Sequence, residues 1–335
     1  MTIRASCELG RTVCSMGKVG LDVIGDIHGH AGKLKQLLCS LGYTERNGVW
    51  QHLSRRAVFI GDLIDRGPEQ LETVRIVQRM TQGGYAYIVM GNHEYNAVCW
   101  ATENRTNPDE HLRPRTGLVG ERNFKQHQRF LEEAGNDTLQ HAEIIDWFRT
   151  IPLWLELDGA RFIHACWDTA SMAHVKQRLN GNAVLTDDVL HLSSQKGHAD
   201  YTAIECLLKG PEVDLPDGYG YIDKDGVPRR KARYAWWRHD AHTYTNGAII
   251  PEGTLGEDGQ THRVLPDTQI PEPPAGLYSD EIPLFVGHYW QSGTTQLLAP
   301  RVACVDYSAG KGGPLVCYQW DGENLLDAAK FVSQQ

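Results

Sequence analysis

Short apolar runs alternate with helical patterns along the first ninety residues of the chain. The runs 19–24, 56–60 and 86–90 are rich in Val, Ile and aromatic residues, which is typical of buried parallel strands. Between these runs, apolar residues recur at the i, i+3, i+4, i+7 spacing of one helix face. They are Leu34, Leu37, Leu38 and Leu41, followed by Leu71, Val74, Val77 and Met80. The order strand–helix–strand–helix–strand predicts right-handed crossovers and a parallel sheet.

Each of the three runs is followed by a short polar string. The strings are Gly-Asp-Ile-His-Gly at 25–29, Gly-Asp-Leu-Ile-Asp-Arg-Gly at 61–67 and Gly-Asn-His-Glu at 91–94. In open α/β sheets, ligands bind beyond the carboxyl ends of the strands. We therefore expect the three strings to converge on one site.

The residue types in these strings predict a two-metal centre. Asp26 and His28 are two apart in extended chain and should point to the same side. Asp62 is expected to end the second strand, and Asn92 with His93 to end the third. Asp, His and Asn without Cys favour Mn, Fe or Zn. The carboxylate of Asp62 can bridge two cations about 3.5–4 Å apart, the spacing of two-metal phosphoester hydrolysis.

The three strings resemble the phosphoprotein phosphatase family of metallophosphoesterases, whose pattern GDxHG, GDxxDRG and GNHE they follow without a mismatch. Two later strings are also similar to it. They are Arg161-Phe162-Ile163-His164-Ala165, where the family usually has Gly after the His rather than Ala165-Cys166, and Phe285-Val286-Gly287-His288. Val305-Asp306 and the run 312–315 look like the family's closing strand and hairpin. The matches extend from about residue 19 to 320.

The resemblance implies an α/β fold: a calcineurin-like metallophosphoesterase β-sandwich flanked by helices, with helical and loop insertions. It implies an N-terminal tail at 1–17 and a single domain at 18–335. The insertions at about 167–235 and 246–283 match nothing in the family pattern, and we expect them to determine the substrate. The chain's start is open between Met1 and Met16.

The same resemblance implies a role for each matching residue. The first cation would be held by Asp26, His28 and Asp62. The second would be held by Asp62, Asn92, His164 and His288. His93 would protonate the leaving oxygen, oriented by Asp65, while a hydroxide held by the cations attacks phosphorus in line. Arg66, Arg238 and Asn92 would bind the phosphate, with Arg238 in the Trp237-Arg238 pair matched less closely.

The implied activity is that of a metal-dependent phosphatase with two divalent ions, Mn first and Fe or Zn as alternatives. Its leading substrate is a phosphomonoester on a protein. A dinucleoside tetraphosphate or another nucleotide or phosphorylated metabolite is the nearest alternative. A nucleic-acid end phosphatase and a non-catalytic binding scaffold remain as further alternatives.

The composition of the chain argues against nucleic acid and membranes as partners. The formal charge of −9 and pI near 5.9 argue against broad nucleic-acid binding. No apolar run approaches the roughly 20 residues of a membrane span, so we expect no membrane partner. Cysteines without a C-x-x-C pair favour free thiols in a reducing compartment, the cytoplasm; those expected to be buried are Cys39, Cys99, Cys166, Cys206, Cys304 and Cys317.

Beyond residue 100 the pattern predicts helices at 121–133, 141–148, 186–192 and 201–208. Segments rich in Gly, Pro and charge at 210–230 and 246–283 predict loops and a hairpin. Asp306 is expected to hold the terminal hairpin. Histidines in polar helical or loop sequence are expected on the solvated surface; they are His111, His127, His141 and His174.

Overall fold

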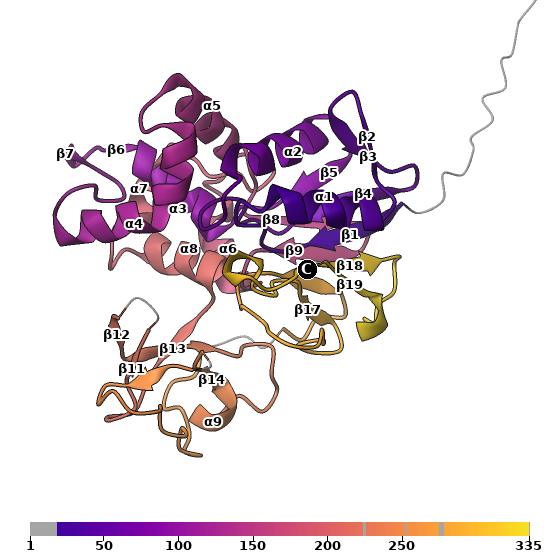
Figure 1. The fold of residues 1–335 in the computed structure, drawn as a ribbon. Helices are drawn as coiled ribbons and strands as arrows, with labels where there is room; N and C mark the ends of the chain where they lie inside the picture. The colour runs from indigo at the N-terminus through magenta and orange to yellow at the C-terminus, as the bar shows by residue number, and fades with distance from the viewer. Residues whose placement is uncertain (1–18, 224–225, 252, 275–277, 335) are drawn as a thin grey trace, which may run out of the picture.

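The structure is a computed structural model that describes residues 19–223, 226–251, 253–274 and 278–334 (Figure 1). The predicted tail at 1–17, and with it Met16, lies outside the described residues. The core of the fold is a pair of β-sheets that pack face to face, with helices on the outside.

The first sheet contains the three strands predicted from the N-terminal pattern. β1 (Gly20–Ile24), β4 (Arg55–Phe59) and β5 (Ala86–Ile88) are parallel neighbours, as predicted. The closing hairpin of β18 (Leu315–Trp320) and β19 (Phe331–Gln334) extends this sheet on the other side of β1, antiparallel to it. The strand order is β19-β18-β1-β4-β5.

The second sheet has the order β17-β16-β9-β8. Its strands are β8 (Trp154–Leu157), β9 (Ala160–Ile163), β16 (Leu284–Val286) and β17 (Val302–Cys304). Alternate residues of β1, Leu21 and Val23, face this sheet and share a buried cluster with Phe162 and Phe285. The two phenylalanine rings are stacked at 5.4 Å. The predicted β-sandwich is therefore present, because period-two alternation gives each sheet one apolar inner face.

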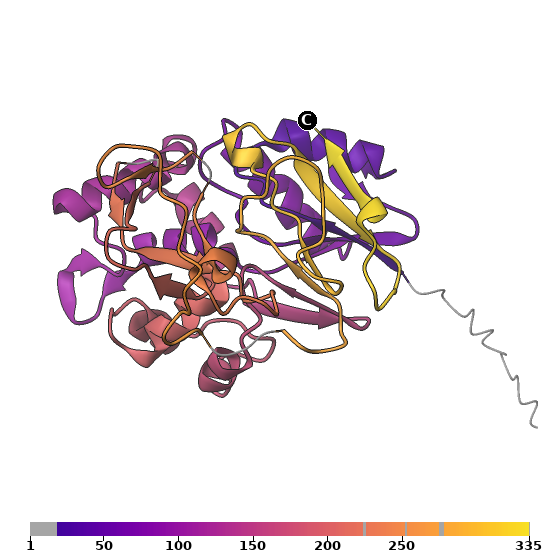
Figure 2. The same ribbon diagram turned by 90° about the horizontal axis from the view of Figure 1, so that it is seen from below.

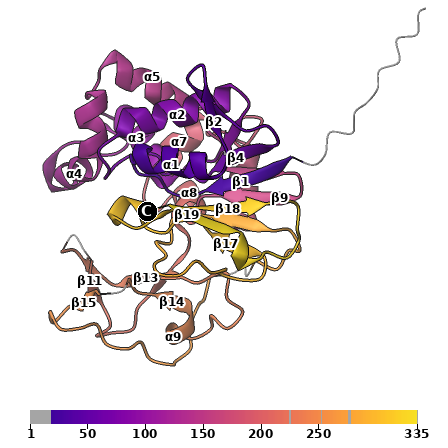
Figure 3. The same cartoon turned by 45° about the vertical axis from the view of Figure 1, so that its right-hand side comes forward.

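The predicted amphipathic helices cover the outer face of the first sheet (Figures 1 and 3). They are α1 (Ala31–Ser40) and α2 (Gln70–Gln82). The residues that defined their apolar stripes are buried except Leu71, which is half-buried, and Leu41 lies just past the end of α1. A hairpin of β2 (Thr44–Arg46) and β3 (Val49–Gln51), which the pattern did not predict, joins α1 to β4.

The third polar string differs from its prediction. β5 ends at Ile88, and Asn92 and His93 begin a helix, α3 (Asn92–Ala101), rather than ending the strand. The physical reason is a capping interaction: the Glu94 side chain accepts a hydrogen bond from the N–H of Gly91 at 3.1 Å. The side chains of this string are consequently held by a helix N-terminus.

A largely helical insertion follows α3. The four helices predicted in it are present with shifted ends: α4 (Gly117–Ala134), α5 (Leu139–Phe148), α7 (Asp187–Ser193) and α8 (Ala199–Lys209). The additional elements are β6 (Glu103–Asn104), β7 (Asn107–His111) and α6 (Thr169–Lys176). The surface prediction was wrong for His127 and His141, which are 3% and 2% exposed.

The segment between α8 and β16 forms two small sheets (Figures 1 and 2). One has the order β10-β13-β14 and the other β12-β11-β15. Most of this segment is irregular, as predicted. Its elements are β10 (Glu212–Asp214), β11 (Tyr221–Ile222), β12 (Pro228–Arg229), β13 (Lys231–Tyr234), α9 (Tyr244–Gly247), β14 (Ala248–Ile249) and β15 (Leu255–Gly256). Two 3₁₀ turns, η1 (Ala309–Lys311) and η2 (Ala328–Lys330), follow β17 and β18.

The described residues bear on two expectations from composition, that the chain has no membrane span and that its cysteines are buried. None of their helices combines the length and the apolar content needed to cross a bilayer. Of the described cysteines, all of which are free thiols, four are buried as predicted, but Cys39 is exposed and Cys206 is half-buried. Cys39 lies near the end of α1, outside the stripe that faces the sheet.

Candidate metal centre

The carboxylate of Asp62 lies between two histidines contributed by distant parts of the chain. Its Oδ2 is 3.7 Å from His28 Nε2, and its Oδ1 is 3.4 Å from His164 Nε2. His28 follows β1, Asp62 follows β4 and His164 follows β9, so the ends of both sheets meet at this carboxylate. All three side chains are at most 2% exposed.

Backbone carbonyls orient both imidazoles. His28 Nδ1 donates to the carbonyl of Ile64 at 2.9 Å, and His164 Nδ1 donates to that of Ile60 at 2.6 Å. Because a carbonyl can only accept, each ring carries a proton on Nδ1, and Nε2 is the nitrogen that faces Asp62. This is the arrangement that metal-binding histidines usually have.

Two further side chains, those of Asn92 and His288, lie on the His164 side of Asp62. Asn92 Oδ1 lies 3.2 Å from His164 Nε2, so that two acceptors face each other, which a cation or a proton between them would satisfy. His288, which follows β16, is buried, and neither ring nitrogen has a hydrogen-bond partner among the described residues. Potential ligand atoms lie within 4.8 Å of one another in two sets, one of His28, Asp62 and His93 and one of Asp62, His164 and His288.

The electrostatics of the site favour positive charge at the centre. Burial lowers the pKa of His164, but the Asp62 carboxylate outweighs it and raises that pKa to about 10. Burial likewise raises the pKa of Asp62, yet His164 and His93 hold it well below its usual range. The protein's own charges thus keep Asp62 ionised at neutral pH and attract a cation toward it.

His28 and His288 have the opposite tendency. Burial, followed by the positive charge of Arg66, lowers the pKa of His28 well below its usual range. Burial, followed by that of Arg233, does the same for His288. Both rings are therefore neutral at physiological pH, which is the form that binds metals.

Asp26 lies beside these groups but outside both sets of ligand atoms. Its carboxylate accepts from the backbone N–H of His288 at 3.2 Å. Burial and the nearby Asp306 raise the pKa of Asp26 well above its usual range. A Cβ on Gly287 would lie 2.2 Å from Asp26 Oδ1, so only glycine allows the two loops to approach this closely.

Glu94 supports the loop of Asp62, a role that the motif alone did not reveal. It is fully buried, and its two oxygens accept from the backbone N–H groups of Asp62 and Leu63, each at 2.8 Å. Burial, followed by the Asp62 charge, raises the pKa of Glu94 to about 7. The glutamate therefore ties the start of α3 to the loop after β4.

Asp65 lies between two histidines. His93 Nδ1 is 2.5 Å from Asp65 Oδ2, as expected for an oriented acid, and His93 Nε2 is 3.8 Å from Asp62 Oδ2. The other Asp65 oxygen accepts from His127 Nδ1 at 2.8 Å. Burial would raise the pKa of Asp65, but His127 and then His93 outweigh it and hold that pKa well below its usual range.

The two predicted phosphate-binding arginines lie in different surroundings. Arg66 follows Asp65, is half-buried, and has its guanidinium 5.2 Å from the centre of the Trp290 ring. Arg238 is exposed and forms a bidentate ion pair with Asp240, with both N–O distances 3.0 Å. A phosphate contact would require Arg238 to leave Asp240. A different arginine, Arg233 of β13, donates to the backbone carbonyl of His288 at 3.0 Å.

The residues present fit a pair of divalent cations. The donor set is imidazole nitrogen and carboxylate or amide oxygen without a thiolate. It includes three buried imidazole nitrogens that have no hydrogen-bond partner in the part of the chain that the structure describes. Such donors suit Mn, Fe or Zn. Asp306, predicted to be structural, accepts from the backbone N–H groups of Trp290 and Ser308 at 3.0 and 2.9 Å and so holds the loops that carry this site.

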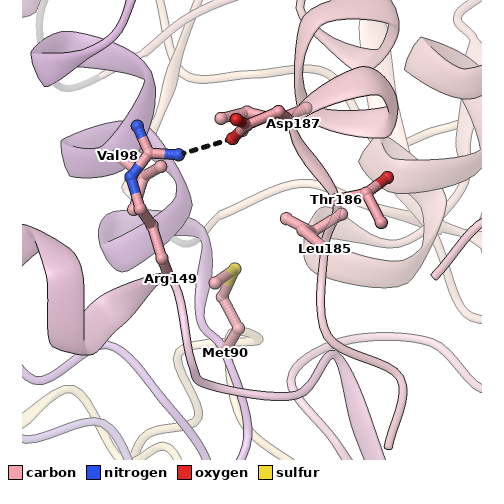
Figure 4. A pocket seen from close by; sticks show the side chains of 7 residues that line it. Met90, Val98, Arg149, Leu185, Thr186 and Asp187 are labelled. Atoms are coloured by element: carbon pink, nitrogen blue, oxygen red, sulfur yellow. Dashed lines mark hydrogen bonds and ion pairs between the residues drawn. The ribbon is translucent and has the colours of Figure 1, made fainter. Parts of the chain in front are cut away.

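A small pocket away from this centre is too small to bind a substrate. It lies where Met90 and Val98 face the loop of Leu185, and the Arg149–Asp187 ion pair of 3.1 Å closes it (Figure 4). Its free volume of ≈ 10 Å³ holds at most one water molecule.

The sequence matches the family model described as calcineurin-like phosphoesterase over residues 21–248. The chain belongs to the calcineurin-like phosphoesterase family. The predicted family and fold class are thereby confirmed, and the family is consistent with divalent metal ions at the centre described above. The matched range contains every predicted site residue except His288.

Curated relatives of this phosphoesterase are bis(5'-nucleosyl)-tetraphosphatases. The asymmetrical enzyme PrpE of Oceanobacillus iheyensis is 30% identical over 146 residues, which are 43% of this chain and 54% of the relative. PrpE of Bacillus subtilis is 45% identical over 73 residues, which are 22% of this chain and 30% of the relative. The chain thus spans about half or less of the length of these curated relatives.

Solved structures with a similar fold include two protein phosphatases. A cold-active protein-tyrosine phosphatase of a psychrophilic Shewanella is 16% identical with a TM-score of 0.44, covering 95% of this phosphoesterase and 81% of that chain. A serine/threonine phosphatase of Saccharomyces cerevisiae with similarity to human phosphatase PP5 is 15% identical with a TM-score of 0.45, covering 96% and 80%.

Proposed function

We propose that this protein hydrolyses phosphoric esters with two divalent cations bound on either side of Asp62. The observation that carries the proposal is the position of this carboxylate, whose two oxygens each face a different imidazole, 3.7 Å from His28 and 3.4 Å from His164. A carboxylate whose two oxygens point in different directions is suited to bridge two cations.

Asp62 would share each of the two cations with a different set of metal ligands. Asp26 and His28 would join it in holding one cation, and Asn92, His164 and His288 in holding the other. When bound, such a pair provides a nucleophile at neutral pH and offsets the phosphate charge. Mn is the metal proposed first, with Fe and Zn as alternatives.

The remaining residues would bind substrate and transfer a proton. Arg66 presents a planar guanidinium suited to two phosphate oxygens. His93 would donate a proton from Nε2 to the leaving oxygen, because its Nδ1 is already committed to Asp65 at 2.5 Å. Asp65 would hold that ring in place. Arg238 would have to exchange its Asp240 partner for phosphate to take part.

Two substrate classes remain candidates. The first is a phosphomonoester, with a phosphorylated protein as the leading example. The second is a dinucleoside tetraphosphate, which is favoured by the name of the curated relatives from Oceanobacillus and Bacillus. Both present a tetrahedral phosphate to the same groups.

Phosphate release by metal-stripped protein reloaded with Mn tests this proposal. A phosphopeptide, p-nitrophenyl phosphate and diadenosine tetraphosphate should be compared side by side. Turnover of the first two alone supports a monoester phosphatase, and preference for the third supports nucleotide hydrolysis. Absence of Mn-dependent turnover on all three contradicts the proposal. His239→Asn, which changes an exposed histidine outside the site, serves as the control variant.

A further inference from the structure

Three cationic side chains gather around one indole beside the metal centre. The centre of the Trp290 ring lies 3.4 Å from Lys311 Nζ, 4.6 Å from Arg233 Cζ and 5.2 Å from Arg66 Cζ. Each such contact is attractive because the face of the ring carries negative charge density. We call Trp290, Arg66, Arg233 and Lys311 the indole cluster.

The indole cluster adjoins both proposed cation positions. Arg233 donates to the backbone carbonyl of His288 at 3.0 Å. On the other side, Gly310 packs against His28 and Arg66, since a Cβ there would lie 2.7 Å from His28 Cδ2 and 2.9 Å from Arg66 Cδ. The cluster therefore borders the place where a phosphate on the cations would lie.

The two guanidiniums of the cluster differ in their partners from several other arginines of this protein. Arg55, Arg75 and Arg178, for example, pair with the carboxylates of Asp22, Glu72 and Asp200. Among the described residues, neither Arg66 nor Arg233 forms an ion pair with an acidic side chain. Asp306, the acidic group that interacts with both, uses its oxygens for backbone N–H groups.

Positive charge gathered in this way is unfavourable without an anion. The chain carries a formal charge of −9, so three cationic side chains around one ring are a local reversal of the overall balance. Like charges at close range repel one another, and an anionic ligand that contacts them relieves that repulsion. Planar guanidiniums in particular match phosphate oxygens.

We infer that Arg233, Lys311 and Trp290, next to Arg66, form a subsite for a second phosphoryl group, one linked by an anhydride to the phosphate held on the cations. This inference rests on the proposed function and favours, of its two candidate substrate classes, the one with linked phosphates. A simple phosphomonoester would leave Arg233 and Lys311 unused. Trp290 packs against the cationic side chains of Arg66, Arg233 and Lys311.

The test compares a ligand with linked phosphates and a substrate without them. Inorganic tripolyphosphate and p-nitrophenyl phosphate serve as the pair, with Mn-loaded protein. Arg233→Gln, Lys311→Gln and the double variant should lower the ratio of kcat/KM for tripolyphosphate to that for p-nitrophenyl phosphate by about tenfold or more, as expected for lost charge-assisted hydrogen bonds. Calorimetry should show tripolyphosphate binding weakened by a similar factor.

Arg56→Gln is the matched control. Arg56 also lies over an aromatic ring, with its Cζ 5.6 Å from the centre of Tyr85, but it belongs to the start of β4. It should leave the ratio and the binding unchanged. Lys311 is exposed, so its variant reports on the subsite even if Arg233→Gln fails to fold.

Several outcomes would overturn the inference. A ratio within twofold of wild type in the double variant would do so, and so would an equal loss on both substrates, which would assign these residues to the scissile phosphate. A selective loss on an acidic phosphopeptide, with tripolyphosphate unaffected, would assign the cluster to peptide. If wild type binds tripolyphosphate through Lys311 but hydrolyses none of the substrates, the proposed function fails while the subsite stands.

Discussion

His127 donates from Nδ1 to Asp65 Oδ1 at 2.8 Å, on the side of the carboxylate opposite to His93. The His127 ring is buried between Trp100 and Phe130, at ring distances of 6.2 and 5.0 Å, and its Nε2 has no hydrogen-bond partner among the described residues. The backbone N–H of Asp65 is also fixed, because it donates to Gln70 at 2.7 Å. His127 therefore positions the carboxylate that orients the proposed acid.

Replacing His127 by Phe should reduce proton transfer more than binding. The Asp65 carboxylate would lose one of its two imidazole partners, a charge-assisted bond whose loss corresponds to about tenfold in rate. We expect kcat for an alkyl phosphate to fall by about that factor, with KM little changed and p-nitrophenyl phosphate less affected. His141→Phe is the matched control, because His141 is equally buried but does not contact Asp65.

The variant His93→Asn should keep its metals and lose turnover. A poor leaving group needs the proton most, so an alkyl phosphate should lose at least about a hundredfold in kcat, and p-nitrophenyl phosphate less. Metal content and initial rates measure the two effects. Equal activity of variant and wild type on the alkyl phosphate would rule out His93 as the acid. Adding His127→Phe to this variant should cause little further loss, since His127 acts through Asp65 on His93.

Substitution of Asp62 by Asn should disturb both cations. The amide removes the negative charge that both sets of ligands share, and we expect metal affinity to fall by roughly a hundredfold or more. The metal content of protein freed of excess Mn should then drop below two ions per chain. Asp240→Asn removes an exposed carboxylate and provides the control. Retention of two tightly bound ions by Asp62→Asn would refute the bridging role.

His141 should make the protein less stable as the pH falls. Burial lowers its pKa from the ordinary 6.5 to about 4, and the charges that face it are His127, Asp137 and Arg115. Below pH 6.5 the unfolded chain binds a proton that the folded chain does not, so stability declines from pH 6.5 to about pH 4, by up to about 3 kcal/mol.

The variant His141→Phe should lack this decline. Urea unfolding at pH 7.5, 6.0, 5.0 and 4.5 would measure it as the difference between the two proteins. That difference should be constant above pH 6.5 and shift in favour of the variant at lower pH. A difference independent of pH would mean that His141 is protonated equally in the folded and unfolded states.

Periodicity was sufficient to predict the two crossover helices and the parallel strands, because their apolar stripes match the sheet face they cover. It failed for α3, where Asn92 and His93 begin a helix whose short polar start resembles a strand end. For His127 a signal existed. His127, Phe130, Leu131 and Ala134 lie at helical spacing and form the buried face of α4, so a histidine in that register should have been assigned to the interior.

The groups around the metal centre could be predicted only in part. The motifs marked the residues that converge on Asp62, since chemistry restricts those residue types. Arg233 and Lys311 carried no such mark, because a lone cation in a loop or short strand resembles any surface residue. Arg233 in β13 and Lys311 in the η1 turn lie 57 and 21 residues from Trp290 along the chain. The long irregular segments between them follow no periodicity, so the sequence does not predict that the three residues meet.

The backbone of the site loops adopts a conformation that most side chains avoid. His28, Asp62, Asp65, Arg66 and His288 all have positive φ angles, between 49° and 75°. Each such residue costs on the order of 1 kcal/mol or more relative to a relaxed backbone. The loops thus hold their functional groups ready at the expense of conformational stability, and cation binding offsets that expense. Cations that bind only the folded chain should stabilise it, so the melting temperature of a preparation should rise with its metal content.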